Sequence, residues 1–136
     1  MAIRARTFTY AVSLDPDGSA TSDAGGPALP AEEAWSPEHL VLAGLLRCSL
    51  TSLRFHAAKD GVAVNASGDT SATVTRREDD GRYAFVEIDV RADLTLSPPP
   101  VNVRELLTRA ERDCFVGASL TISPTYSWTV NGEEIR

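Results

Sequence analysis

The sequence predicts an α+β domain in which mostly antiparallel sheets wrap around a buried central helix. Three observations carry this prediction. Residues 40–46 are apolar around a whole helical turn, alternating segments flank that helix on both sides, and tight turns join consecutive strands. A chain of 136 residues, 43% of them hydrophobic, suits one domain over residues 1–136.

The first predicted element is a half-buried strand over residues 3–14, where apolar and polar side chains alternate. The motif Asp15-Pro-Asp-Gly18 predicts a turn, and residues 19–21 would return as a short partner strand. A loop rich in Gly and Pro over residues 23–30 then leads to the first helix.

That helix has clear start and stop signals. Ser36 is suited to the N-cap, Pro37 to the first helical position, and Glu38 to the positive end of the helix dipole. The segment Lys59-Asp-Gly61 predicts its end. A helix that is apolar on every side over residues 40–46 must be covered by a sheet or by a partner subunit.

Two strands are predicted after this helix, over residues 62–75 and 84–96, with a hairpin turn at residues 78–81. The second strand alternates cleanly from Ala84 to Leu96. The prolines of residues 97–100 end it, because proline interrupts the hydrogen bonding of a sheet.

A second helix begins at Asn102, since Asn102 and Glu105 resemble a capping box. Leu106, Leu107 and Ala110 would form its inner face, and a last strand is expected over residues 120–130. The predicted order is therefore β-β-α-β-β-α-β.

Composition excludes several classes of partner. The net charge of -6 and the scattered arginines argue against nucleic acid and against anionic membrane surfaces. No apolar run reaches transmembrane length once Arg47 and Arg54 are counted, and the N-terminus lacks the apolar stretch of a secretion signal. We therefore expect a cytoplasmic protein. Two cysteines are too few for a structural zinc site, so neither a metal nor a cofactor is expected.

The two cysteines, Cys48 in the first helix and Cys114 at the end of the second, are the candidate reactive groups. Each could instead be a small buried hydrophobe. In the cytoplasm a transient, catalytic disulfide is more plausible than a permanent one. Cys48 follows Glu38 by ten residues, about 15 Å of helix, so the helix dipole cannot be the main activator of its thiol and a cation is required.

The motif Ser36-Pro-Glu38, Cys48 ten residues later, and the segment Ala110-Glu-Arg-Asp-Cys114 together resemble the OsmC/Ohr family of cysteine-based hydroperoxide reductases. The resemblance implies an intertwined homodimer with two active sites at the subunit interface. It implies that Cys48 attacks an organic hydroperoxide and that Cys114 resolves the resulting sulfenic acid as a disulfide. Glu38 would be an electrostatic organiser, and a small or protein dithiol would recycle the enzyme.

The chain departs from the family pattern at two positions. Family peroxidases carry an Arg in the first hairpin turn, held by the Glu of the Pro-Glu motif, and Pro16 stands where that Arg is expected. Phe115 follows the second cysteine, where many relatives have Pro. Arg47 is a candidate replacement cation; the others, elsewhere in the chain, are Arg4, Arg6 and Arg54.

Two alternatives therefore stand beside the peroxidase. The same fold could serve a small-molecule-binding protein or a thiol protein of another specialisation, with Pro16 as the main argument. It could also be a structural dimeric stress protein with inert cysteines. His39 and His56 are expected at the surface or at an interface, because nothing near them completes a catalytic triad.

Overall fold

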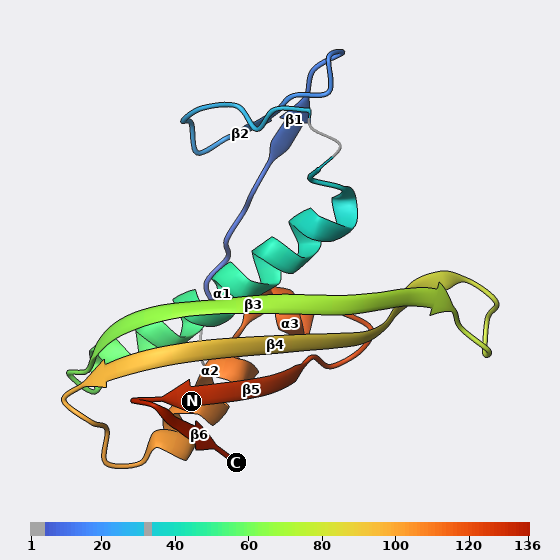
Figure 1. Cartoon of the computed structure of the whole chain (residues 1–136). Helices are drawn as coiled ribbons and strands as arrows, with labels where there is room; N and C mark the ends of the chain where they lie inside the picture. Colours follow the sequence, from blue (N-terminus) through green and yellow to red (C-terminus); the bar gives the residue numbers. More distant parts are fainter. Residues whose placement is uncertain (1–4, 32–33) are drawn as a thin grey trace. The chain divides into compact units, whose positions relative to one another are not determined.

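A computed structural model describes residues 5–31 and 34–136 of the chain (Figure 1). The chain divides into two compact units, residues 1–37 and 38–136. The larger unit carries both cysteines, the long helix and a four-stranded sheet.

The N-terminal unit contains an antiparallel hairpin of β1 (Val12–Leu14) and β2 (Ala20–Ser22). Its turn is the predicted one, with Gly18 at φ +88°. The predicted half-buried strand over residues 3–14 is wrong in length and burial: residues 5–11 form no strand and Tyr10 is 78% exposed. A two-stranded hairpin offers no second layer against which that alternating face could pack. Residues 3 and 4 lie outside the described residues.

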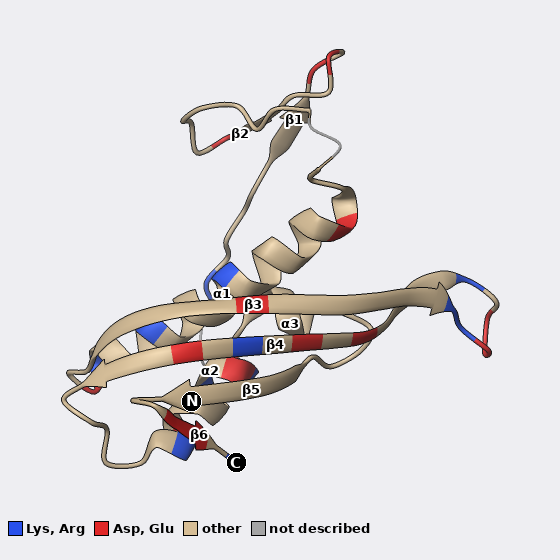
Figure 2. Cartoon of the chain, viewed as in Figure 1, with Lys and Arg blue, Asp and Glu red and all other residues tan. Residues whose placement is uncertain are grey.

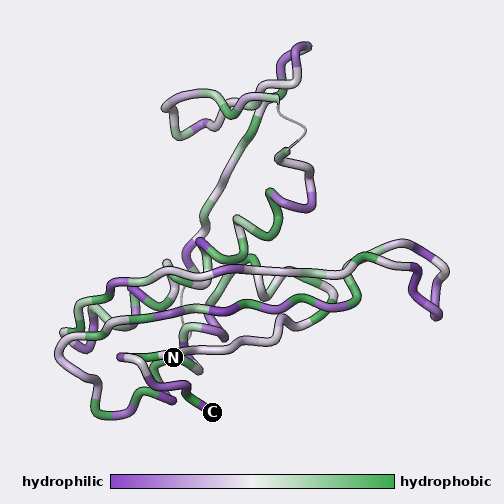
Figure 3. Tube along the Cα trace, viewed as in Figure 1, coloured by the Kyte–Doolittle hydropathy of each residue, from purple (hydrophilic) through white to green (hydrophobic). Residues whose placement is uncertain are grey.

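Helix α1 (Pro37–Lys59) begins at the predicted proline and ends before Gly61, which has φ +71°. Figure 3 shows hydrophobic residues well into its N-terminal half. The sequence predicted that residues 40–46 would be covered by a sheet or by a partner subunit. Leu40 and Val41 are 39% and 36% exposed, and burial begins at Leu45. Residues 38–136 therefore leave the apolar surface before Leu45 partly uncovered, and cover by a partner subunit stays a prediction.

The sheet contains β3 (Ala63–Arg76), β4 (Tyr83–Ser97), β5 (Thr125–Val130) and β6 (Glu133–Ile135), in that spatial order. The pairs β3–β4 and β5–β6 are antiparallel, as predicted for most of the sheet, whereas β4–β5 is parallel. The helical connection between β4 and β5 makes the parallel pairing feasible. The last predicted strand begins later than expected, at Thr125, and β6 was not predicted.

Two further helices connect β4 to β5. Helix α2 (Val103–Arg112) starts as predicted, with the Asn102 side chain accepting a hydrogen bond from the Glu105 N–H at 3.2 Å. Its expected inner face is confirmed, since Leu106, Leu107 and Ala110 are buried. Helix α3 (Phe115–Ala118) follows, with Cys114 as its N-cap.

The two faces of the sheet differ in chemistry. Helices α1 and α2 lie on one face (Figure 1), where alternate β4 residues such as Ala92, Leu94 and Leu96 join the core. The intervening residues Glu87, Arg91 and Asp93 are exposed, and their charges follow β4 in Figure 2. The alternation of a strand thus separates an apolar face, which holds both cysteines, from a charged face.

Candidate functional site

One turn of backbone brings the two predicted cysteines together. The Val116 N–H donates to Cys48 Sγ at 3.5 Å, and the Gly117 N–H donates to Cys114 Sγ at 3.4 Å. Both residues belong to one apolar cluster with Leu45. Both are free thiols, and Cys114 is near enough to Cys48 to contribute to the raised pKa of the Cys48 thiol. The site therefore holds two reduced thiols on a shared scaffold.

A contact between α1 and the residue before Cys114 helps to fix the position of Cys114. Asp113 is the C-cap of α2, and its Oδ2 lies 2.8 Å from His56 Nε2. His56 is only 8% exposed, so its expected surface or interface position is wrong for this chain. The available signal was periodicity: His56 follows Ser49 by seven residues and Ser52 by four, which places all three on one helix face.

The environment of Cys48 disfavours its thiolate. Burial is the largest cause of a raised pKa for the Cys48 thiol, and hydrogen bonding and Coulombic repulsion from Cys114 raise it further. The Val116 N–H acts in the opposite direction and is outweighed. Within the described residues 38–136 no cation contributes to this shift. Arg47, the predicted neighbouring candidate, is exposed.

Cys114 has a different environment, completely buried and lined by hydroxyls. Ser49 Oγ lies 3.6 Å from Cys114 Sγ and 3.0 Å from the hydroxyl of Tyr126. The Tyr126 ring stacks on Trp128 with centroids 5.6 Å apart, and Trp128 donates to Glu111 at 3.0 Å. Burial raises the pKa of Tyr126 to about 12. Sequence reasoning missed Ser49 and Tyr126, because a serine after a cysteine and a tyrosine in a strand carry no distinctive signal.

The third predicted site residue does not join the cysteines. Glu38 is exposed in the first turn of α1, and ten residues of helix, about 15 Å, separate it from Cys48. Pro16 occupies the turn of the N-terminal hairpin, as expected from the sequence. Within residues 38–136 the thiol pair therefore lies apart from Glu38, and the organising role of Glu38 stays a prediction.

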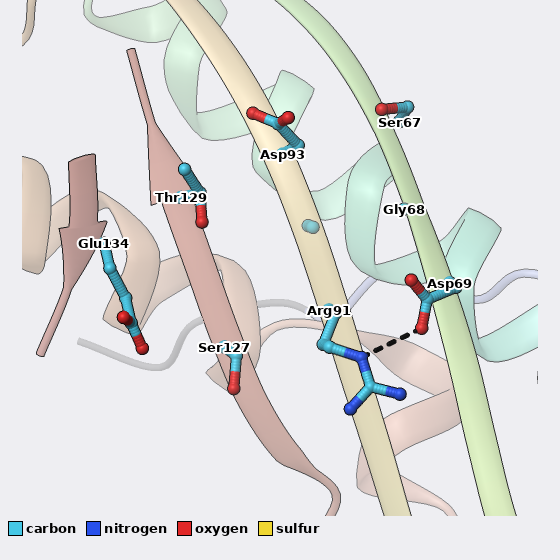
Figure 4. Close-up of a pocket in the computed structure, with 9 residues that line it drawn as sticks. Ser67, Gly68, Asp69, Arg91, Asp93, Ser127, Thr129 and Glu134 are labelled. Atoms are coloured by element: carbon cyan, nitrogen blue, oxygen red, sulfur yellow. Dashed lines mark hydrogen bonds and ion pairs between the residues drawn. The ribbon is translucent and has the colours of Figure 1, made fainter. Parts of the chain in front are cut away.

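Figure 4 shows a polar hollow on the charged face of the sheet, away from the face that holds the cysteines. Arg91 donates to Asp69 across it at 3.0 Å, and hydroxyls of Ser127 and Thr129 border it. Among the described residues, no group of three or more His, Cys, Asp or Glu side chains could hold a metal ion. None of the helices in the described ranges combines the length and hydrophobicity needed to cross a membrane.

Comparison with known families identifies the chain. Residues 30–129 match the family described as OsmC-like protein, a span that contains both cysteines and Glu38. The chain belongs to the OsmC-like family. No curated protein matches its sequence.

Solved structures of this family share the fold. An OsmC-like protein from Mycoplasma pneumoniae is 19% identical with a TM-score of 0.65, covering 92% of this chain and 97% of its own. The organic hydroperoxide resistance protein of Bacillus subtilis is 19% identical with a TM-score of 0.59, covering 91% and 98%. That of Elizabethkingia anophelis is 18% identical with a TM-score of 0.62, covering 92% and 96%. The predicted family and α+β class are confirmed.

Proposed function

We propose that this OsmC-like protein is a thiol peroxidase that reduces organic hydroperoxides to alcohols. The observation that carries the proposal is the shared turn, whose N–H groups bind the sulfurs of both Cys48 and Cys114. Two free thiols held by neighbouring N–H groups of one turn suit disulfide formation, which needs one sulfur to attack the other. Structural relatives named organic hydroperoxide resistance proteins support the substrate class.

The reaction proceeds in three balanced steps. The Cys48 thiolate attacks the O–O bond of the hydroperoxide, and the alkoxide leaves and takes a proton to become the alcohol. Cys48 is then a sulfenic acid. Cys114 attacks its sulfur, forming the Cys48–Cys114 disulfide and releasing water. An external dithiol, small or protein, reduces this disulfide and restores both thiols.

The proposal includes a homodimer that completes the site. In the larger unit Leu40, Val41, Phe55 and Phe115 are all exposed, with Phe115 next to Cys114 and 57% exposed. Exposed apolar side chains of this kind are typical of an interface. A partner subunit would cover them, enclose an apolar substrate and supply the cation that Cys48 lacks. Glu38 would orient that cation.

One equivalent of cumene hydroperoxide added to the reduced protein tests this function. We expect loss of the peroxide and a Cys48–Cys114 disulfide, detected by mass spectrometry of peptides from unreduced digests. Cys48→Ser should consume no peroxide. Cys114→Ser should consume one equivalent and retain a sulfenic acid that dimedone traps. Full peroxide consumption by Cys48→Ser would overturn the proposal.

A second candidate function is a small-molecule-binding or otherwise specialised thiol protein with the same fold. The raised pKa of the Cys48 thiol and Pro16 in the hairpin turn favour it. Alkylation of Cys48 by iodoacetamide across pH separates the two, because only the thiolate reacts. A midpoint well below the ordinary thiol value of about 8.5 supports the peroxidase, and a midpoint at or above it supports the binding protein.

A further inference from the structure

The hydroxyl of Ser49 is almost completely buried and makes three polar contacts. Ser49 is 1% exposed, and its Oγ lies 2.8 Å from the Leu45 carbonyl oxygen, 3.0 Å from Tyr126 Oη and 3.6 Å from Cys114 Sγ. Its surroundings are otherwise apolar, with Leu45, Ile88 and Val90 in the same cluster. All three contacts therefore compete for one hydroxyl group.

Counting hydrogens assigns the donors. A serine hydroxyl has one hydrogen and two lone pairs, and a carbonyl oxygen can only accept. Ser49 therefore donates to Leu45, and it accepts from Tyr126 and from Cys114. In this reduced state Cys114 is the donor of its hydrogen bond, which means that its sulfur carries a proton.

That proton must leave when Cys114 attacks the Cys48 sulfenic acid. The Leu45 carbonyl, four residues before Ser49, also lies in the backbone hydrogen-bond pattern of α1 and keeps that partner if the hydroxyl turns away. The Ser49 hydrogen can then point at the sulfur of Cys114. Tyr126 continues to donate to Ser49 Oγ, and with a pKa of about 12 it remains a protonated donor at neutral pH.

We propose that Ser49 is a catalytic residue of the disulfide-forming step, its hydroxyl turning from the Leu45 carbonyl to the Cys114 sulfur as that sulfur loses its proton. Tyr126 is the positioning residue that holds the Ser49 oxygen. The inference rests on the proposed function and extends it to a step for which the family resemblance named only the cysteines.

The step balances within the site. Cys114 forms a bond to the Cys48 sulfur, and the sulfur–oxygen bond of the sulfenic acid breaks. The proton lost by Cys114 goes to the departing oxygen, which leaves as water. Cys114 is oxidised and Cys48 is reduced, so no further oxidant is needed. A hydrogen bond to a developing thiolate is charge-assisted and stronger than the neutral bond it replaces.

A serine on a helix can also bond to the carbonyl four residues earlier with no further role, as Thr51 does with Arg47 at 2.8 Å. Ser52 provides a matched control for this alternative. It is buried on the same helix at 8% exposure, and among the described residues its Oγ has no hydrogen-bond partner. Ser49→Ala and Ser52→Ala therefore each remove one buried hydroxyl from the same helix, but only the first touches Cys114.

The experiment follows both half-reactions after a pulse of cumene hydroperoxide. Stopped-flow measurement gives the rate of peroxide loss, and acid quenching with mass spectrometry gives Cys48 as sulfenic acid, disulfide or sulfinic acid. For Ser49→Ala we expect disulfide formation to slow by about tenfold or more relative to the loss of the first equivalent of peroxide, and more Cys48 sulfinic acid to form under excess peroxide. Tyr126→Phe should shift the products in the same direction by less, and Ser52→Ala should match the wild type.

The outcomes separate this inference from the function on which it depends. Disulfide formation in Ser49→Ala at the rate of Ser52→Ala, with the wild type active, overturns the role of Ser49 alone. Failure of the wild type to form any disulfide overturns the proposed function and this inference together. If circular dichroism shows that Ser49→Ala is misfolded, Tyr126→Phe becomes the deciding variant. Wild-type ratios of disulfide to sulfinic acid in Tyr126→Phe would then overturn the role of the Ser49 and Tyr126 hydroxyls.

Discussion

Cys48 and Cys114 receive backbone hydrogen bonds from adjacent residues, yet their sulfurs have different surroundings. Cys114 is fully buried, beside the hydroxyl of Ser49, and its preceding residue is bound by His56. Cys48 is half-buried. Among the described residues, the groups that lower the pKa of its thiol are the Val116 N–H and the neighbouring backbone. Within residues 38–136, the cysteine proposed to resolve has a buried hydroxyl beside it, whereas no cation lowers the pKa of the cysteine proposed to attack.

In the proposed function, this difference divides the tasks between the chain and a partner subunit. In the proposed reaction, the second thiol needs a fixed position more than it needs a low pKa, because it would meet a reactive sulfenic acid already held beside it. The first thiol must become a thiolate before it can meet a hydroperoxide from solution. Burial within one chain provides the fixed position, while the charge needed by Cys48 has to be added from outside the described residues 38–136.

The largest expected effect concerns the packing around Cys114. Leu45→Ala removes a completely buried side chain from the cluster that contains Cys114 and should lower the free energy of unfolding by about 2–5 kcal/mol. Urea unfolding followed by circular dichroism measures this change. Thr51→Ala, on the exposed face of the same helix, should stay within about 0.5 kcal/mol. Equal effects of the two variants would contradict the view that tight packing around Leu45 holds Cys114 in place.

The next effect comes from the contact that holds the residue before Cys114. Asp113→Ala leaves the buried His56 imidazole without its partner and should cost about 1–3 kcal/mol of folding free energy. It should also speed alkylation of Cys114 by iodoacetamide, since the turn is released from α1. Arg112→Ala, which removes an exposed side chain 3.8 Å from the same carboxylate, is the control and should change little.

A smaller effect should appear in the pH dependence of Cys48. Because Cys114 raises the pKa of the Cys48 thiol, Cys114→Ala should lower the pH at which Cys48 is half-alkylated. The thiolate fraction at neutral pH then rises, and so does the alkylation rate. Rates of iodoacetamide reaction measured across pH on this variant and the wild type test the direction. An upward movement of the midpoint would show that Cys114 stabilises the thiolate.

The smallest effect is spectroscopic. The folded-state pKa of Tyr126 is about 12 against an ordinary value of about 10, so folding favours the phenol. The stability gained from this is present below pH 10 and is lost as pH rises through 12. In an absorbance titration at alkaline pH, one of three tyrosines should ionise late, and Tyr126→Phe should remove that late step. A late step that survives in the variant belongs to another tyrosine.

Sequence patterns predicted the elements that depend on local signals. The start of α1 at Pro37, the inner face of α2 and the turn before Gly81 all follow from capping, periodicity and turn residues. Burial was predicted less well, and Tyr10 and Val41 are both exposed. Periodicity indicates which side chains share a face, but what covers that face depends on chain segments or subunits far away in sequence.

By itself, the sequence determined the family and the α+β class, and it singled out the two cysteines as candidate reactive groups, because these depend on short motifs and their spacing. The tertiary structure alone decided which groups surround each sulfur. Ser49, Tyr126 and His56 come from α1 and β5, and they meet Cys114 and Asp113 only after α1 packs across the sheet and beside α2. These contacts join residues that are 57 to 77 positions apart in the sequence, so no local sequence pattern predicts them.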